Sequence, residues 1–175
     1  MKAPTLRGER VELRAIAVAD LDELHRILAT PDVARWWNPH TRAELEKWLA
    51  EDGVSRWTIR VDGEPAGKIQ AYEEGGDEFR HAGIDLFLDP DLHGRGLGQE
   101  CISLVARWLF RERGHHRLVI DPALANERAI RCYEAVGFRH VGVMRRYWYD
   151  HTLGDWVDGL LLDLLESELR SPASG

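Results

Sequence analysis

The chain has 175 residues, of which 44% are hydrophobic and 30% are charged, an ordinary composition for one globular domain. Its net charge of −7 argues against a nucleic-acid partner, which requires a basic face. The same charge is compatible with a cationic substrate, although most acidic surfaces serve only solubility. The sequence has no stretch typical of a signal peptide or a membrane span, so we expect a cytoplasmic protein with no membrane partner.

The first half of the chain alternates strands with amphipathic helices. We expect a strand at 10–16 and a helix at 19–28, whose leucines and isoleucine fall on one face. A second helix at 41–49 opens on the capping-box pattern "TRAE". Strands at 55–61 and 65–72 follow, joined through the hairpin dipeptide "DG".

The second half begins with a strand at 79–88, which "DP" terminates. Further helices and strands are expected in the order helix 101–110, strand 117–120, helix 127–136, strand 139–149 and strand 155–165. This order predicts an α+β fold with a mainly antiparallel sheet and one strand–helix–strand crossover in its middle. We expect a single domain over 1–170 and a loose C-terminal tail at 171–175.

The residues that commonly bind metals are not arranged to do so. Cys101 and Cys132 both fall in predicted helices and form no metal-type pair. His115 and His116 follow a helix-ending glycine, with no Cys or acidic partner at zinc spacing. We therefore expect reduced, buried thiols and no bound metal.

Three glycines at alternate positions, Gly94, Gly96 and Gly98, lie between a predicted strand and a predicted helix. The start of a helix attracts anions, and glycines let the backbone approach a pyrophosphate without Cβ clashes. Arg95, between two of the glycines, would add a charge-assisted bond. Gln99 stands where a Walker loop needs lysine and where a dinucleotide fingerprint needs its third glycine. The alternative is a glycine-rich turn without a ligand.

The segment "LDPDLHGRGLG", followed after a helix and a strand by "NERAIRCYEAVGF", resembles the two motifs of the GNAT superfamily of acyl-CoA-dependent N-acyltransferases. The resemblance implies a three-layer fold, with helices flanking a central, mainly antiparallel mixed sheet, and acetyl-CoA as co-substrate without a metal. It implies that acetyl-CoA is bound by Phe87, Leu88, His93, Gly94, Arg95, Gly96, Gly98, Gln99, Asn126 and Tyr133. His93 occupies a position where the family usually has Gln or Arg, whereas the backbone contacts need only the glycines.

Four segments, "RWWNP", "DGEPAGKIQAY", "AGIDLFL" and "IDPALANERAIRCYEAVGF", are similar to segments of the aminoglycoside 6′-N-acetyltransferases. That similarity implies that Asp85 is the catalytic base and that Asp121 binds a substrate amine. We also expect Trp36, Trp37 and Tyr72 in the acceptor site, because adjacent tryptophans can wall a pocket; core packing is the alternative use of the tryptophans. The final hairpin resembles instead that of the ribosomal-protein N-terminal acetyltransferases.

The chemistry of amine acetylation agrees with these roles. An alkylammonium with a pKa near 10.4 is neutral in only about one molecule in 2,500 at pH 7, and only the neutral amine attacks a thioester. Asp85 stands in an otherwise apolar run, where it can take this proton directly or through water; a salt bridge to a neighbouring arginine is its structural alternative. We expect backbone N–H groups of Phe87 and Leu88 to stabilise the thioester oxygen and Tyr133 to protonate the departing thiolate.

The sequence thus predicts an acetyl-CoA-dependent N-acetyltransferase that acts directly on a primary amine, with an aminoglycoside-like polyamine as the favoured acceptor. A protein N-terminus or another small amine is a second reading, and a non-catalytic acyl-CoA-binding module is a third. The joint presence of Asp85, Asn126 and Tyr133 speaks against that third reading. The expected partner is a small cationic amine, with no nucleic acid, and the chain is expected to be a monomer or a homodimer.

Overall fold

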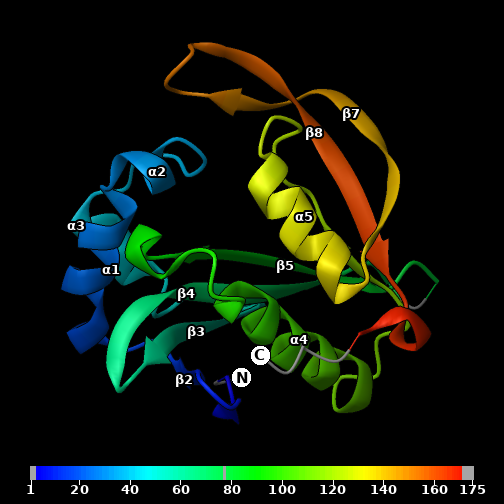
Figure 1. Ribbon diagram of the computed structural model, residues 1–175, viewed down its shortest axis with the longest axis horizontal. Helices are drawn as coiled ribbons and strands as arrows, with labels where there is room; N and C mark the ends of the chain where they lie inside the picture. The colour runs from blue at the N-terminus through cyan, green and yellow to red at the C-terminus, as the bar shows by residue number, and fades with distance from the viewer. Residues whose placement is uncertain (1–2, 77, 171–175) are drawn as a thin grey trace.

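The structure is a computed structural model that describes residues 3–76 and 78–170. Its centre is one eight-stranded mixed sheet with the strand order β1-β2-β3-β4-β5-β6-β8-β7 (Figure 1). The architecture is a single α+β domain, as the sequence predicts. The tail predicted at 171–175 lies outside the described residues.

The strands are β1 (Leu6–Arg7), β2 (Glu12–Ala15), β3 (Val54–Val61), β4 (Glu64–Glu74), β5 (His81–Leu88), β6 (Leu118–Ile120), β7 (Arg139–Asp150) and β8 (Asp155–Leu164). Neighbouring strands pair antiparallel except β5 and β6, which are parallel and are connected by a helical crossover. The short β1 is absent from the sequence prediction, because two residues are too few to show an alternating pattern.

The helices are α1 (Leu21–Leu28), α2 (Pro31–Ala34), α3 (Arg42–Lys47), α4 (Leu97–Arg111) and α5 (Glu127–Val136), with 3-10 turns η1 (Val18–Asp20), η2 (Pro90–Leu92) and η3 (Glu166–Glu168). The sequence did not predict α2, a single turn that is too short for helical periodicity. None of the described helices is long and apolar enough to cross a membrane.

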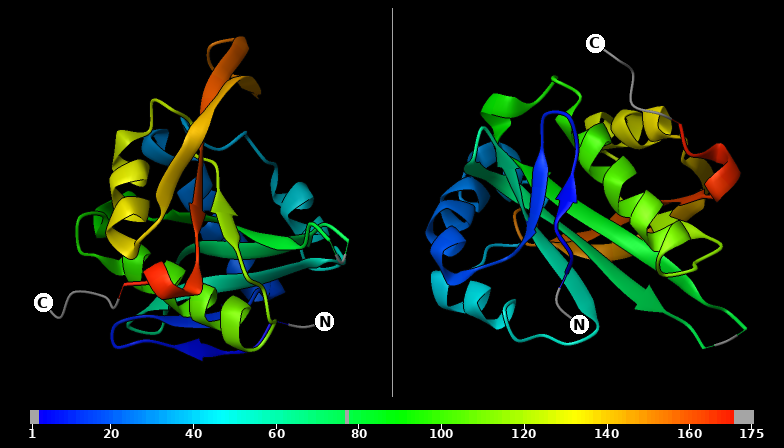
Figure 2. Two further views of the ribbon diagram at one scale, coloured as in Figure 1. Left: turned by 90° about the vertical axis from the view of Figure 1, so that its right-hand side faces the viewer. Right: turned by 90° about the horizontal axis from the view of Figure 1, so that it is seen from below.

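Two apolar clusters cover the two faces of the sheet and create three layers. Ile69 and Ile84 belong to the cluster beneath α4 and α5, whereas Phe87, on the other face of β5, belongs to the cluster with α1–α3. Figure 2 shows α4 and α5 side by side, away from α1–α3. Because side chains alternate along a strand, Asp85 shares the face of Phe87 and lies on the α1–α3 side.

The sheet opens between its two parallel strands. β5 and β6 pair only through Ala82 with Leu118 and Gly83 with Val119. The strands separate beyond these residues, so the remainder of β5, from Ile84 to Leu88, has no partner on its β6 side among the described residues. This separation exposes backbone edge in the middle of the molecule, next to the start of α4.

Candidate active site

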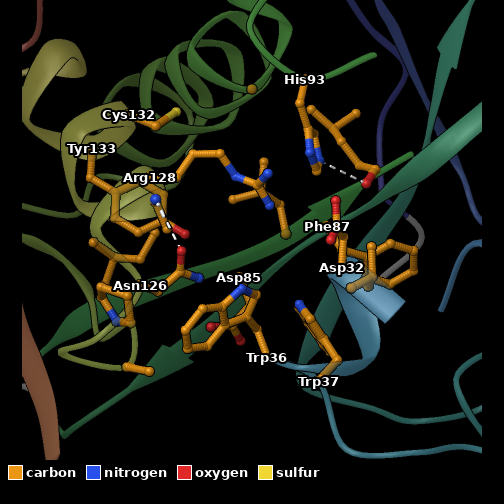
Figure 3. Close-up of a pocket in the computed structure, with 18 of the residues that line it drawn as sticks. Asp32, Trp36, Trp37, Asp85, Phe87, His93, Asn126, Arg128, Cys132 and Tyr133 are labelled. Carbon is orange, nitrogen blue, oxygen red and sulfur yellow. Dashed lines mark hydrogen bonds between the residues drawn. The ribbon is translucent and has the colours of Figure 1, made fainter. Parts of the chain in front are cut away.

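A cleft of about 780 Å³ lies at this opening of the sheet. Its walls come from the segment after α2, the end of β5, the glycine loop, the first half of α5 and part of β7. Figure 3 shows side chains from β5, α5 and the α2 region directed into the same space. The predicted site residues that line it are Trp36, Trp37, Asp85, Phe87, Leu88, His93, Gly94, Gly96, Gly98, Gln99, Asp121, Asn126 and Tyr133.

Two predicted residues, Tyr72 and Arg95, do not line the cleft. The ring of Tyr72 lies across Gly83, where a Cβ would come within 1.9 Å of its Cζ atom, and burial, followed by the charges of Asp85 and Asp121, raises the pKa of its hydroxyl. The side chain of Arg95 is exposed and lines a second, separate depression with Arg7 and Arg10. This placement does not support the predicted phosphate contact of the Arg95 side chain, although the backbone beside it faces the cleft.

The glycine loop is braced from outside the cleft. Gly94 and Gly96 have φ values of 76° and 74°, which favour glycine, and α4 begins at the next residue, Leu97. The Arg10 guanidinium donates from Nη1 to the Arg95 carbonyl at 2.7 Å, and buried Glu100 holds the same guanidinium at 3.0 Å. With that carbonyl held from outside, the loop amides and the unpaired first N–H groups of α4 are left as donors for an anion.

The end of β5 presents one of the two predicted amides to the opening. The Ala82 amide donates to Arg117 on the β6 side, at 3.3 Å, whereas the Asp89 amide donates to Ala66 on the β4 side, at 2.8 Å. Because N–H groups alternate between the two edges of a strand, the Leu88 amide faces the open edge and the Phe87 amide faces β4. The Phe87 ring lines the cleft and packs edge-on against Trp37, at 5.2 Å between ring centroids.

His93 replaces the Gln or Arg usual in the family with a neutral imidazole. Its Nε2 lies 3.1 Å from the carbonyl oxygen of Leu88. A carbonyl only accepts, so Nε2 carries the proton, and the buried Nδ1 has no hydrogen-bond partner among the described residues. Burial, followed by the nearby charge of Arg128, lowers the pKa of His93 and favours this neutral form.

Asp85 lies on β5, half-buried within the cleft. Its Oδ2 accepts a hydrogen bond from the Gln70 amide nitrogen at 2.9 Å. Burial raises the pKa of Asp85, while the Gln70 hydrogen bond and the charges of Lys68 and Arg56 act against the rise. The alternative use of Asp85, a salt bridge to an arginine, does not form within the described residues; Gln70 stands between Arg56 and the carboxylate. A carboxyl group with a raised pKa is a stronger base than an exposed aspartate.

Asp121 follows directly after β6 and faces the same cleft. Its Oδ2 accepts a hydrogen bond from the hydroxyl of Tyr147 at 2.5 Å. Burial raises the pKa of Asp121, and the negative charge of Asp85 adds to the rise. The hydrogen bond to Asp121 in turn raises the pKa of Tyr147 to about 12. The cleft therefore holds two electrostatically coupled carboxyl groups.

Helix α5 contributes Asn126 and Tyr133 to one wall of the cleft (Figure 3). The Asn126 side-chain oxygen accepts from the Ala129 amide at 3.2 Å and caps the helix, which leaves the amide nitrogen of that side chain as a donor. The Tyr133 side chain is buried, and burial raises its pKa, so it retains its phenolic proton well above neutral pH. Burial likewise raises the pKa of the neighbouring Cys132 thiol to about 11.

The tryptophans divide between the site and the core. Trp36 and Trp37 line the cleft, whereas Trp57 is fully buried and packs edge-on against Trp108 at 5.3 Å. Among the described residues there is no group of three or more His, Cys, Asp or Glu side chains that could hold a metal ion.

Sequence reasoning missed several residues that shape the site. Asp32, Arg128, Tyr147 and Trp148 line the cleft, and Arg128 extends from α5 into it in Figure 3. One of these had a signal in the sequence, because Arg128 falls inside the motif "NERAIRCYEAVGF". Lys68 and Gln70, which lie beside the site, also had a signal in the sequence. The polar residues of "GKIQAY" alternate with small or apolar ones, which places Lys68, Gln70 and Tyr72 on one face of β4.

Comparisons with known proteins agree with this fold. The acetyltransferase (GNAT) domain family matches residues 10–139. The chain is 29% identical over 161 residues to aminoglycoside N(6′)-acetyltransferase type 1 of Klebsiella pneumoniae, a match that covers 80% of this chain and 79% of that protein. It is 33% identical over 141 residues to the mycothiol acetyltransferase of Acidothermus cellulolyticus, over 75% of this chain and 41% of the relative.

Solved structures of acetyltransferases share this fold. The aminoglycoside acetyltransferase AAC(6′)-Ib in complex with ribostamycin and coenzyme A superposes with a TM-score of 0.76 at 26% identity, over 91% of this chain and 96% of that chain. Another structure of AAC(6′)-Ib contains acetyl-CoA. A ribosomal-protein-S5-alanine acetyltransferase from Vibrio fischeri shares the fold, with a TM-score of 0.82 at 16% identity over 96% of this chain and all of that chain.

The fold, with its opened sheet and glycine loop, is that of an acetyltransferase that takes its acetyl group from acetyl-CoA. The chain belongs to the GNAT family and is an N-acetyltransferase that uses acetyl-CoA. The predictions of family, fold and enzyme class are confirmed.

Proposed function

We propose that this enzyme transfers the acetyl group of acetyl-CoA directly to a primary amine of a small polycation of the aminoglycoside kind. The observation that carries the proposal is the pair of coupled carboxyl groups, Asp85 and Asp121, in one cleft with Trp36 and Trp37. A polyamine presents several ammonium groups at fixed spacings and can therefore engage both acids. The identity to an aminoglycoside N(6′)-acetyltransferase supports this class of acceptor.

In this proposal the pyrophosphate of acetyl-CoA binds to the amides between Gly94 and Gln99, at the positive end of α4. The exposed Arg128 reaches into the cleft from α5 and supplies a positive charge near His93. The acyl end then extends along the open edge of β5, towards Asp85 and Tyr133. The neutral His93 shapes the loop through its hydrogen bond to Leu88.

Asp85 first attracts the acceptor ammonium and then takes its proton, directly or through water. The neutral amine attacks the thioester carbon, and the Leu88 amide on the open edge stabilises the oxygen as negative charge builds. Asp121 binds a second ammonium of the acceptor and so orients the first one. Both steps require the carboxylate forms, and a bound cation favours these forms because it offsets the burial of the two acids.

After the attack the nitrogen carries one proton too many, and it loses this proton to solvent. Collapse of the tetrahedral intermediate breaks the carbon–sulfur bond and releases coenzyme A thiolate. Tyr133 donates its phenolic proton to this sulfur and regains a proton through solvent. The thiol is a fair leaving group, with a pKa near 8.5, so this assistance is moderate. Transfer is direct, without a covalent enzyme intermediate, and Cys132 remains a protonated thiol because burial raises its pKa to about 11.

The test is thiol release from acetyl-CoA measured against a panel of aminoglycosides, simple diamines and peptides, with the Asp85→Asn variant as the background. We expect kcat/KM to be highest for aminoglycosides and lowest for peptides with one amine. A panel in which peptides react well and aminoglycosides do not would overturn the proposed acceptor.

A further inference from the structure

Lys68 is a buried charge that the proposed reaction does not use. Its side chain, on β4, is 1% exposed, and its Nζ atom lies 4.1 Å from the ring centroid of Trp48 and 4.5 Å from that of Trp37. Phe87 forms a third side of this aromatic cage, at 5.8 Å. Aromatic faces attract a cation, but burying an ammonium still costs several kcal/mol in total. A methionine would fill the same space without that cost.

The hydrogen bonds of Lys68 lead to the acceptor site. Its Nζ donates to Oε1 of Gln70 at 2.9 Å, and the Nε of Arg56 donates to the same oxygen at 3.0 Å. The Arg56 guanidinium can only donate, so it fixes the amide oxygen on this side, and the Lys68 Nζ donates to the same oxygen. The Gln70 nitrogen must therefore face the opposite side, where it donates to Asp85.

A fixed amide donor favours one form of Asp85. The Gln70 nitrogen can only donate, so it stabilises a carboxylate oxygen better than a protonated carboxyl group. Below its own pKa of about 7, Lys68 is charged and acts in the same direction, through a buried region where charges are weakly screened. The aromatic cage also ties the position of Lys68 to Trp37, which lines the cleft.

We infer that Lys68 is a positioning residue, which locks the Gln70 amide and holds Asp85 oriented and ionised for its work in the cleft. This inference rests on the proposed role of Asp85 as the base. Lys68 itself is buried and is not among the residues that line the cleft.

Other charged and titratable groups act on this network from each neighbouring element. Burial lowers the pKa of Lys68 to about 7, with Asp85 and Glu51 raising it and Arg56 lowering it. The remaining groups that interact electrostatically with Lys68 or Asp85 are His40, Tyr72, Asp121, Tyr133 and Tyr147. Removing Lys68 deletes one of the causes that lower the pKa of Asp85, so the remaining groups leave that pKa higher.

The first experiment measures the two ionisations in the resting enzyme by NMR, without acceptor or acetyl-CoA. The chain has three lysines, Lys2, Lys47 and Lys68, so an ¹⁵N-lysine spectrum is simple. We expect one ammonium to titrate near pH 7 and to be missing from Lys68→Met. In a ¹³C-aspartate sample, the titration of the Asp85 carboxyl group should move upward by about one pH unit in Lys68→Met.

The matched control is Lys47→Met, the same change at an exposed position on α3. It should leave the Asp85 titration in place. Gln70→Leu removes the connection while keeping Lys68, and should also move the Asp85 titration upward; it provides the test if Lys68→Met does not fold. An unchanged Asp85 titration in a folded Lys68→Met or Gln70→Leu protein would overturn the inference.

The second experiment separates this inference from the proposed function. If Asp85 is the base, the acidic limb of the plot of kcat/KM against pH should move upward in Lys68→Met by as much as the Asp85 titration does. Below the limb, kcat/KM should then be about tenfold lower than in the wild type. The KM for acetyl-CoA should be unchanged. A merely structural role would lower the rate at every pH while leaving both the limb and the Asp85 titration in place, and would overturn the inference. An NMR shift with an unmoved limb would uphold the network and overturn the role of Asp85 as base.

Discussion

At the scale of single residues, the two acids of the cleft are expected to do different work. Asp85→Asn removes the base, and we expect the turnover number to fall about 100-fold or more. Asp121→Asn leaves the base in place and should mainly raise the KM for the acceptor. The increase should correspond to a loss of roughly 1.5–3 kcal/mol of binding free energy, the contribution of a charge-assisted hydrogen bond. Steady-state kinetics with an aminoglycoside separate the two effects. A silent Asp121→Asn variant would contradict a second ammonium contact.

Tyr133 is a second residue whose role can be isolated. The change Tyr133→Phe removes only the hydroxyl group, so we expect turnover to fall about 10- to 1,000-fold while the affinity for acetyl-CoA is retained. Because burial raises the pKa of this phenol, the wild-type enzyme should show no loss of rate from Tyr133 ionisation up to about pH 10, the ordinary pKa of tyrosine. A Phe variant that turns over at the wild-type rate across the pH range would rule out the acid role.

At the scale of elements, the strand β5, the glycine loop and α4 act as one unit. The φ of Gly96 is 74°, and a Cβ there would lie 3.5 Å from the Arg10 guanidinium that braces the loop. We expect Gly96→Val to lower the affinity for acetyl-CoA by at least about 100-fold, because a β-branched residue strains this conformation and covers the amides. Isothermal titration calorimetry measures the affinity directly.

Gly142 on β7 offers the matched control for that substitution. It has no positive φ, and a Cβ added there would meet open space. Gly142→Val should therefore bind acetyl-CoA normally. If a folded Gly96→Val protein bound acetyl-CoA as tightly as Gly142→Val, the pyrophosphate would have to lie elsewhere.

At the scale of the whole molecule, the buried Lys68 links stability to pH. Its pKa is about 7 in the folded protein, against the ordinary lysine value of 10.5 that applies to the unfolded chain. Between these two pKa values the unfolded state binds more protons, so this residue makes stability rise as the pH rises from about 7 to 10. We expect the free energy of unfolding in urea to rise over that interval by on the order of 2–4 kcal/mol more in the wild type than in Lys68→Met. A constant difference between the two proteins would contradict a depressed lysine pKa.

The overall charge should also appear in the kinetics. The net charge of −7 attracts polycations over a distance, and added salt screens this attraction. We expect the KM for an aminoglycoside to rise several-fold as ionic strength increases from about 0.02 to 0.3 M, with a much smaller change for a peptide that has one amine. Equal salt dependence for both acceptors would argue against a polycation as the preferred substrate.

The sequence by itself determined the family and the fold class, and 13 of the 29 residues that line the cleft were among its predicted site residues. Local signals were sufficient for this. Gly94 and Gly96 mark a loop that only glycine readily adopts, Asn126 caps α5, and the apolar periodicity of α1, α4 and α5 defines the buried faces. These features depend on near neighbours in the chain, which is why a pattern of letters predicts them.

The tertiary structure alone decided where those residues point. Leu88 and not Phe87 presents its amide to the opening, because β4 already pairs with the other edge of β5. The Arg95 side chain lies outside the cleft, where Arg10, 85 residues away in the sequence, donates to the Arg95 carbonyl. Lys68, Gln70 and Asp85 form one network only because β4 and β5 lie side by side. Such contacts join distant segments, and their geometry follows from sheet register and packing, which no local pattern encodes.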